Sequence, residues 1–308
     1  MLETFKIKTP LVQLDSIKDN DVSIKLEGNN LYGSAKDRCA MYVLCQLLEK
    51  KIINQETKII ESSSGNMGVA LAAIGARLHL DVTIVIDPSI SHLNEFLIKG
   101  YGAQTIKVME ADENGSYLKQ RLQAVQDYLA KHENAYWINQ YGNPLVIEAY
   151  KQTVGKEILM QKPDLDYLFI AVSSGGTVAG ISAAMHEYNP NIKVVAVDVE
   201  GSKIFDPETK KVKHFTGIGS SIRTDNFLRA SIDDRIIVSE SDSTKALFKM
   251  MRKEQLFLGG SSGCVMSGVE QYIEKHHLKN KKIVLVSHDR GDRYFGNLYS
   301  KHLEYMNL

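Results

Sequence analysis

Short runs of β-branched and other apolar residues alternate with longer segments of helical periodicity along nearly the whole chain. The runs that read as strands are Val22–Glu27, Lys58–Glu61, Val82–Ile86, Thr105–Val108, Tyr167–Val172, Val194–Val199, Ile236–Val238 and Ile283–Val286. Most precede a segment of helix length, which predicts an α/β fold with a mostly parallel sheet. The 308 residues allow about two domains. Because no linker rich in Pro, Gly or Ser divides the chain, we expect the two domains to be interleaved.

Charge and hydropathy exclude two classes of partner. Lys and Arg total 37, as do Asp and Glu, and no basic run occurs, so we do not expect nucleic-acid binding. No stretch approaches the ~18 apolar residues of a membrane-spanning helix, and Met1–Leu14 lacks the apolar core of a signal peptide. The cysteines, Cys39, Cys45 and Cys264, lack metal-ligand spacing. We therefore expect no metal, no membrane contact and a reducing, cytoplasmic location.

A lysine stands where local electrostatics disfavour it. Gly33–Arg38 reads GSAKDR, and Asp37–Lys51 has helical periodicity, so Lys36 lies in or just before the first turn of a helix. The N-terminus of a helix is partly positive, and an ammonium there loses a few tenths of a kcal/mol or more. A lysine with a destabilised protonated form suits the role of nucleophile or base. Taken alone, a solvated surface lysine would be the better explanation of this position.

Three turns rich in Gly and Ser each precede a predicted helix, and we expect all three at carboxyl ends of strands. They are Glu61–Gly68 before Val69–Leu78, Ser173–Thr177 before Val178–Ala184, and Gly259–Gly263 before Cys264–Lys275. Their N–H groups and hydroxyls suit a phosphate or a carboxylate, although helix capping alone would also explain them. Together they indicate a ligand at the strand ends. Asp198 keeps a dinucleotide site as an alternative, but the second turn lacks the G-x-G-x-x-G spacing.

In this order, the motifs resemble those of the pyridoxal-phosphate (PLP) β-replacement enzymes, the cysteine synthase and cystathionine β-synthase family. The matching segments are Thr9–Leu14, Gly33–Arg38, Ser63–Asn66, Ser174–Thr177, Gly217–Gly219, Gly260–Gly263 and Asp289–Tyr294. The resemblance implies two interleaved three-layer α/β domains, the tryptophan synthase β-like PLP fold. Residues 1–34 and 140–308 would form a large PLP-binding domain, and residues 35–139 a small, mobile substrate-binding domain. It also implies a homodimer that acts on small amino-acid substrates.

The resemblance further assigns roles to the motif residues. Lys36 would form the Schiff base with the cofactor and act as the base, Asn66 would bind the ring hydroxyl oxygen, and Ser261 would face the pyridine nitrogen. The remaining cofactor residues would be Ser174, Gly175, Gly176, Thr177 and Gly219. The substrate carboxylate would lie against Ser63, Ser64, Gly65 and Met67. A serine at the ring nitrogen leaves the pyridine unprotonated, which favours loss of a leaving group from Cβ over a long-lived carbanion.

Within this family, the chain resembles the N-(2-amino-2-carboxyethyl)-L-glutamate synthases. These enzymes join O-phospho-L-serine to L-glutamate through an aminoacrylate, toward 2,3-diaminopropionate for siderophores and antibiotics. They share an apolar residue at Met67, where cysteine synthases usually have threonine, and the stretch Ala135–Tyr141, which includes Gln140. The residues that these enzymes use to bind the phosphoserine substrate correspond to Arg121, Tyr141 and Ser173. Arg121 borders the apolar face of a helix predicted at Tyr117–His132.

Two alternatives remain for the function. Cysteine synthase activity, with sulfide and O-acetylserine or O-phosphoserine, would use the same motifs. A catalytically silent binding or regulatory homologue is the alternative from another class. The presence of Lys36, Asn66 and Ser261 argues against the silent homologue.

Overall fold

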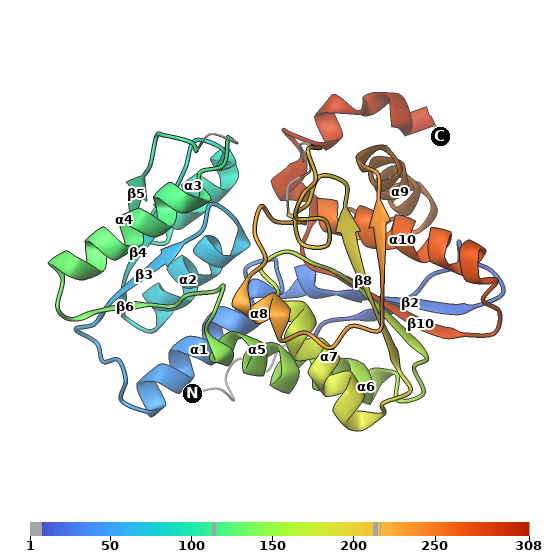
Figure 1. Cartoon of the computed structure of the whole chain (residues 1–308), viewed down its shortest axis with the longest axis horizontal. Helices are drawn as coiled ribbons and strands as arrows, with labels where there is room; N and C mark the ends of the chain where they lie inside the picture. Colours follow the sequence, from blue (N-terminus) through green and yellow to red (C-terminus); the bar gives the residue numbers. More distant parts are fainter. Residues whose placement is uncertain (1–7, 113–114, 212–214, 216, 308) are drawn as a thin grey trace. The chain divides into compact units, whose positions relative to one another are not determined.

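A computed structural model describes residues 8–112, 115–211, 215 and 217–307 (Figure 1). Two compact units emerge from its internal contacts. The smaller comprises Lys36–Leu145, and the larger combines Lys8–Ala35 with Val146–Leu308. The predicted domain boundaries were 34/35 and 139/140, and the observed ones are 35/36 and 145/146. Residues 1–7 of the predicted large domain lie outside the described residues. The assignment of cofactor binding to one unit and of mobile substrate binding to the other stays a prediction.

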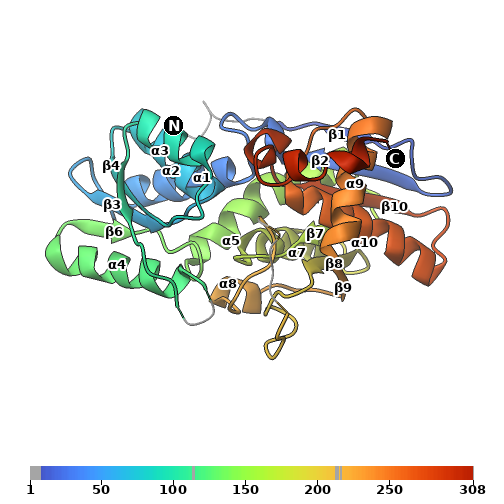
Figure 2. The same cartoon turned by 90° about the horizontal axis from the view of Figure 1, so that it is seen from above.

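Four parallel strands form the sheet of the smaller unit, in the order β5-β4-β3-β6. The strands are β3 (Lys58–Ser62), β4 (Asp81–Ile86), β5 (Gln104–Lys107) and β6 (Ala135–Trp137). Its helices are α1 (Lys36–Glu49), α2 (Asn66–Arg77), α3 (His92–Gly100) and α4 (Leu118–Lys131). In Figure 2, α4 lies on the opposite face of the sheet from α1, α2 and α3. Ile60 and Val85 of the sheet pack with Val125 of α4, all three fully buried.

Six strands form the sheet of the larger unit, in the order β1-β2-β10-β7-β8-β9. They are β1 (Leu11–Gln13), β2 (Asp21–Leu26), β7 (Tyr167–Ala171), β8 (Lys193–Val199), β9 (Asp234–Val238) and β10 (Lys282–Ser287). All neighbours are parallel except the edge strand β1, which is antiparallel to β2. In β7 and β10, Phe169 and Leu285 face the main core of this unit. Their neighbours Leu168 and Val284 point to the other face and are equally buried, so both faces are covered, as parallel sheets require.

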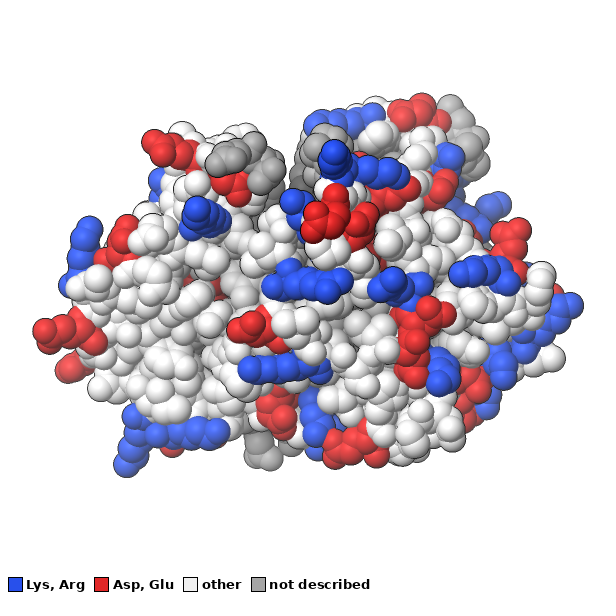
Figure 3. Space-filling model, in the orientation of Figure 1, with Lys and Arg blue, Asp and Glu red and all other residues white. Residues whose placement is uncertain are grey.

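The larger unit also contains most of the remaining helices. The α-helices are α5 (Pro144–Tyr150), which starts at the boundary, α6 (Lys156–Gln161), α7 (Gly176–Tyr188), α8 (Asp225–Leu228), α9 (Glu240–Lys253) and α10 (Gly260–His276). The short 3-10 helices are Glu27–Asn29, Gly291–Tyr294, Tyr299–Lys301 and Leu303–Asn307, and a π-helical turn spans Lys151–Gly155. No helix among the described residues is both long and apolar enough to span a membrane. Acidic and basic side chains are interspersed on the face drawn in Figure 3.

A buried ion pair attaches the N-terminal segment to the larger unit. The Lys25 ammonium on β2 is fully buried and lies 2.5 Å from a Glu157 carboxylate oxygen on α6. It also donates to the Thr9 carbonyl at 2.7 Å. A buried charge without a partner is strongly destabilising, so this segment has one favourable place to pack. The pair explains why residues far apart in the sequence share one unit, as the interleaved fold requires.

The predicted α/β class, with two interleaved units each built around a mostly parallel sheet, is confirmed. Each predicted strand is present, with ends that differ by one or two residues at most. The sequence did not reveal β1 and β6, because three-residue strands show no useful periodicity. Three predicted helices begin earlier than expected, at Asn66, Gly176 and Gly260, so motif residues occupy first helical turns rather than loops.

The expectation that Gly259–Gly263 follows a strand is wrong. The preceding element is a helix, α9, and Leu258 forms only an isolated antiparallel bridge with Arg290. This bridge and the bond from the Gly259 N–H to the Asp289 carbonyl, at 3.0 Å, attach the turn to the segment after β10. A long-range contact therefore brings the turn to a strand end that the sequence order does not supply.

Candidate active site

Strand order places the candidate substrate loop at a topological switch point. From β3 the chain passes through α2 to β4 on one side, whereas β6 pairs on the other side of β3. Ligands of open α/β sheets bind outside the carboxyl ends of strands at such points. Ser63–Gly65 follows β3, and Gln140 and Tyr141 follow β6. Gln140 Nε2 donates to the Ser62 carbonyl at 3.0 Å, and the Tyr141 hydroxyl lies 3.5 Å from the same oxygen.

The start of α2 offers backbone donors to an anion. Gly65 precedes the helix, and Asn66 and Met67 are its first two residues. The first N–H groups of a helix lack intrahelical acceptors and favour negative charge. The Ser63 N–H donates to the Val85 carbonyl at 3.0 Å, and the Ser63 hydroxyl oxygen accepts from the Gly65 N–H at 3.3 Å. Only the backbone of Met67 suits a carboxylate, because its side chain is apolar and buried.

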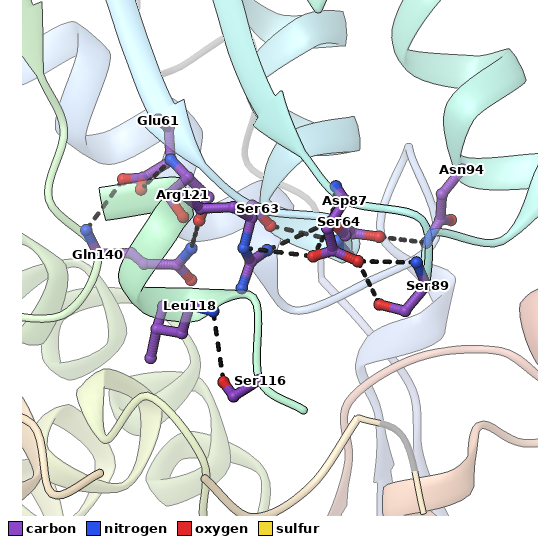
Figure 4. A network of polar contacts seen from close by, with 12 residues as sticks. Glu61, Ser63, Ser64, Asp87, Ser89, Asn94, Ser116, Leu118, Arg121 and Gln140 are labelled. Carbon is purple, nitrogen blue, oxygen red and sulfur yellow. Dashed lines mark hydrogen bonds and ion pairs between the residues drawn. The ribbon is translucent and has the colours of Figure 1, made fainter. Parts of the chain in front are cut away.

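A cluster of charged and hydroxyl groups surrounds Ser64 (Figure 4). Arg121 on α4 donates from Nη1 to the Ser64 hydroxyl at 3.3 Å, and its Nε lies 3.3 Å from Asp87 Oδ2. The Ser64 hydroxyl donates to the same Asp87 oxygen at 2.8 Å. Asn94 on α3 donates to the Ser64 carbonyl at 3.3 Å. The structure thus brings the predicted residues Ser64 and Arg121 together, and it adds Asp87, which the sequence did not identify.

Glu61 is a second residue that sequence reasoning missed. Its side chain is fully buried at the end of β3, where it accepts hydrogen bonds from the Gln140 N–H at 3.0 Å and the Trp137 indole at 3.3 Å. Burial raises the pKa of the Glu61 carboxyl from an ordinary 4.5 to about 7, although these hydrogen bonds favour the charged form. The sequence did contain a signal for Glu61, because a carboxylate within a strand that is otherwise largely buried is unusual and points to a special role.

The larger unit presents a glycine turn that packs closely against neighbouring residues of the same unit. Gly175 has φ +83°, and a Cβ there would lie 2.2 Å from the Phe227 nitrogen. Gly176, the first residue of α7, would place a Cβ 2.4 Å from a Val146 methyl. Side chains are excluded at both positions, which leaves backbone N–H groups and Thr177 at the helix start. This turn follows β7, next to β10, which is the switch point of the larger sheet.

Two hydroxyl groups, those of Ser173 and Thr224, hold this turn through backbone carbonyls. Ser173 donates to the Gly219 carbonyl at 3.0 Å, and the Gly219 N–H donates to the Val172 carbonyl at 2.8 Å. Thr224 donates to the Ser174 carbonyl at 2.9 Å. The bond from Thr224 fixes the Ser174 carbonyl, which belongs to the turn itself. A phosphate group fits such a helix N-terminus, so this part of the chain is chemically suited to the phosphate of PLP.

Ser261 lies in the first turn of α10 and is 1% exposed. The turn before it is held by Asp289, whose carbonyl accepts from the Gly259 N–H at 3.0 Å. The approach is so close that a Cβ on Gly259 would lie 1.7 Å from Asp289 Oδ1. Tyr294 donates to the other Asp289 oxygen at 2.6 Å. The motif near the C-terminus therefore supports the Ser261 turn. The alternative residue Asp198 is buried, and one of its oxygens accepts from the Val199 N–H at 2.9 Å.

Lys36 is the first residue of α1, as the sequence predicted. The chain before it is fixed within the larger unit, because the Ala35 N–H donates to the His288 carbonyl at 2.8 Å and Ser34 bridges to Asp289. Lys36 itself belongs to the smaller unit, as do Asn66 and the predicted substrate residues other than Ser173. Ser173, the turn Ser174–Thr177 and Ser261 belong to the larger unit. The three cysteines Cys39, Cys45 and Cys264 are buried and form no disulfide with one another.

The fold, with helix N-termini at the strand ends of each sheet, is typical of an α/β enzyme that binds an anionic ligand. A family model described as pyridoxal-phosphate dependent enzyme matches residues 2–289. The chain therefore belongs to the pyridoxal-phosphate dependent enzymes, and PLP is its cofactor. Bound PLP supplies an electron sink for an amino-acid substrate, which permits removal of the Cα proton.

Solved structures of cysteine synthase type resemble the whole chain. A hydrogen sulfide-producing enzyme of Fusobacterium nucleatum is 29% identical, with a TM-score of 0.87, over 96% of this chain and 90% of that one. A second such enzyme of the same organism is 26% identical, with a TM-score of 0.88, over 96% and 99%. The O-acetylserine sulfhydrylase isoform 3 of Entamoeba histolytica is 25% identical, with a TM-score of 0.89, over 97% and 91%.

Proposed function

We propose that the protein catalyses β-replacement on an activated L-serine, with O-phospho-L-serine and L-glutamate as substrates. The products are N-(2-amino-2-carboxyethyl)-L-glutamate and phosphate. Membership of the PLP-dependent family and similarity to enzymes of O-acetylserine and hydrogen sulfide chemistry support β-replacement. The homodimer, the cytoplasmic location and a role in making a siderophore or antibiotic precursor extend this proposal.

The guanidinium of Arg121, beside the candidate carboxylate loop, is the observation that favours phosphoserine over acetylserine as the substrate. Its Nη1 lies 3.3 Å from the Ser64 hydroxyl, and the side chain is 14% exposed. A guanidinium has five N–H donors, and the contacts with Ser64 and Asp87 occupy only part of them. A phosphate leaving group gains charge-assisted hydrogen bonds from such a group, whereas the neutral ester of acetylserine does not.

The chain's own residues supply the other functions in this proposal. Lys36 holds the cofactor, takes the proton from Cα of the substrate and returns it to Cα of the product. The N–H groups at the start of α2, with the Ser63 hydroxyl, hold the substrate carboxylate. Gln140 and Tyr141 fix the loop through the Ser62 carbonyl. Asn66, Ser261 and the turn Ser174–Thr177, braced by Gly219 and Ser173, orient the cofactor.

A sulfur nucleophile is the second candidate for the incoming group. The similarity to hydrogen sulfide-producing enzymes at 26% and 29% identity favours it. Met67 favours glutamate instead, because cysteine synthases usually have a hydroxyl donor at this position and the chain does not. The two candidates share the first half of the reaction and differ only in the group that adds to Cβ.

A product screen separates these candidates. The purified PLP enzyme is offered O-phosphoserine or O-acetylserine, each with glutamate or with sulfide, and the products are identified by mass spectrometry. We expect the glutamate adduct from phosphoserine as the dominant product. Cysteine as the sole product would replace glutamate with sulfide in the proposal, and absence of any Cβ substitution would overturn the β-replacement itself.

A further inference from the structure

We propose that Asp87 is a positioning residue that sets the preference for an anionic leaving group, because it fixes Ser64 and aims Arg121. The inference rests on the proposed function, in which Arg121 receives the leaving group. Asp87 is the residue directly after β4, and it is 3% exposed. Nothing in its local sequence distinguishes it from a turn residue before Pro88.

Asp87 connects three elements of the smaller unit (Figure 4). Its Oδ2 accepts from the Ser64 hydroxyl at 2.8 Å and lies 3.3 Å from Arg121 Nε. Its Oδ1 accepts from the Ser89 N–H at 2.8 Å and from the Ser89 hydroxyl. Its own N–H donates to the Ser64 hydroxyl oxygen at 3.1 Å. Both carboxylate oxygens therefore have fixed partners, so the orientation of Asp87 is determined.

These contacts use the full capacity of the Ser64 hydroxyl. A serine hydroxyl has one proton to donate and two lone pairs to accept. Its proton goes to Asp87 Oδ2, and its oxygen accepts from the Asp87 N–H and from Arg121 Nη1. The resemblance implied that Ser64 would contact the substrate carboxylate. In this arrangement the hydroxyl proton of Ser64 is already donated to Asp87. The side chain of Ser64 instead holds the arginine.

The same contacts orient the guanidinium of Arg121. Asp87 Oδ2 lies 3.3 Å from Nε in an ion pair that lacks hydrogen-bond geometry, and the Ser64 hydroxyl accepts from Nη1, so two of the three guanidinium nitrogens have fixed neighbours. Among the residues that the structure describes, Arg121 has no further hydrogen bond or ion pair, which leaves Nη2 for a ligand. A planar fork needs a fixed orientation to hold a phosphate by two bonds. The Asp87 charge also offsets the arginine when no anion is bound.

Removal of the Asp87 charge should therefore affect phosphoserine and spare acetylserine. In Asp87→Asn, one amide oxygen replaces two carboxylate oxygens, so Ser64 and Ser89 can no longer both donate to the side chain. We expect kcat/KM for O-phosphoserine to fall by roughly three- to tenfold, as for one or two misdirected hydrogen bonds. The loss should lie in KM rather than kcat, because the chemistry at Cα is untouched.

The test compares Asp87→Asn, Arg121→Ala and the double variant in the PLP-loaded enzyme. Asp127→Asn is the matched control, because Asp127 is an exposed carboxylate on α4 that contacts Gln123. Steady-state kinetics with O-phosphoserine and O-acetylserine give the substrate ratio, and calorimetry gives the affinity for inorganic phosphate. We expect phosphate to bind more weakly by the same factor in Asp87→Asn. In the double variant, the loss of phosphate affinity should equal that of Arg121→Ala alone, because both changes remove the same interaction, the one between Arg121 and the phosphate.

The outcomes separate this inference from the proposed function. If Arg121→Ala changes the substrate ratio and Asp87→Asn does not, the role of Asp87 is wrong and the function stands. If Arg121→Ala leaves the substrate ratio unchanged, the proposal that phosphoserine is the substrate is contradicted, whatever the result for Asp87→Asn. Should Asp87→Asn not fold, Ser64→Ala removes the link between Asp87 and Arg121 Nη1. An unchanged ratio and unchanged phosphate affinity in Ser64→Ala would then overturn the inference.

Discussion

Glu61 is a single carboxylate whose ionisation couples the stability of the smaller unit to pH. Its carboxyl has a pKa of about 7 in the folded chain, raised by burial from 4.5. Between these values the folded protein holds a proton that the unfolded chain has lost. Stability from this group is therefore fully present below pH 4.5 and is lost as the pH rises through about 7.

Replacement of Glu61 by glutamine should remove this dependence on pH. The free energy of unfolding of the wild type, minus that of Glu61→Gln, should fall by up to about 3 kcal/mol between pH 4.5 and pH 8. Urea denaturation at a series of pH values measures both terms. Glutamine offers an N–H₂ group to neighbours that are all donors, so we also expect a loss that does not vary with pH. A constant difference across this range would contradict the pKa argument.

The glycine turn before α7 combines a positive φ with packing that leaves no room for a Cβ. An alanine at position 175 would combine left-handed strain, about 1–2 kcal/mol, with a Cβ 2.2 Å from the Phe227 nitrogen. Gly175→Ala should therefore displace the turn and lower PLP retention, which absorbance and cofactor content measure. Gly102→Ala is the matched control, because Gly102 has φ +88° and an added Cβ meets nothing within 4 Å. Gly102→Ala should lose about 1–2 kcal/mol of stability and keep PLP; equal cofactor loss in both variants would count against the turn.

The complete chain should be stabilised by its cofactor, because a ligand that binds only the folded state raises stability by mass action. At a concentration 100 times its Kd, the gain is about 2.7 kcal/mol. Removal of PLP with hydroxylamine should lower the Tm, and PLP should restore both the Tm and the yellow colour. If the turn Ser174–Thr177 binds the phosphate, as proposed, pyridoxal should restore less, because it lacks that group. Borohydride reduction followed by peptide mapping should place the retained cofactor on Lys36; an unchanged Tm after removal would contradict the linkage.

Much of this architecture could be read from the chain alone because it depends on local periodicity and on the order of motifs. The strands, the start of α1 at Lys36 and the PLP family follow from patterns within short segments. The residues around the candidate loop do not. Ser64 and Asp87 are 23 residues apart, Ser64 and Arg121 are 57, and Glu61 and Gln140 are 79. Proton direction at Ser64, the orientation of Arg121 and the pKa of Glu61 arise from contacts across those separations, so only the packed fold could decide them.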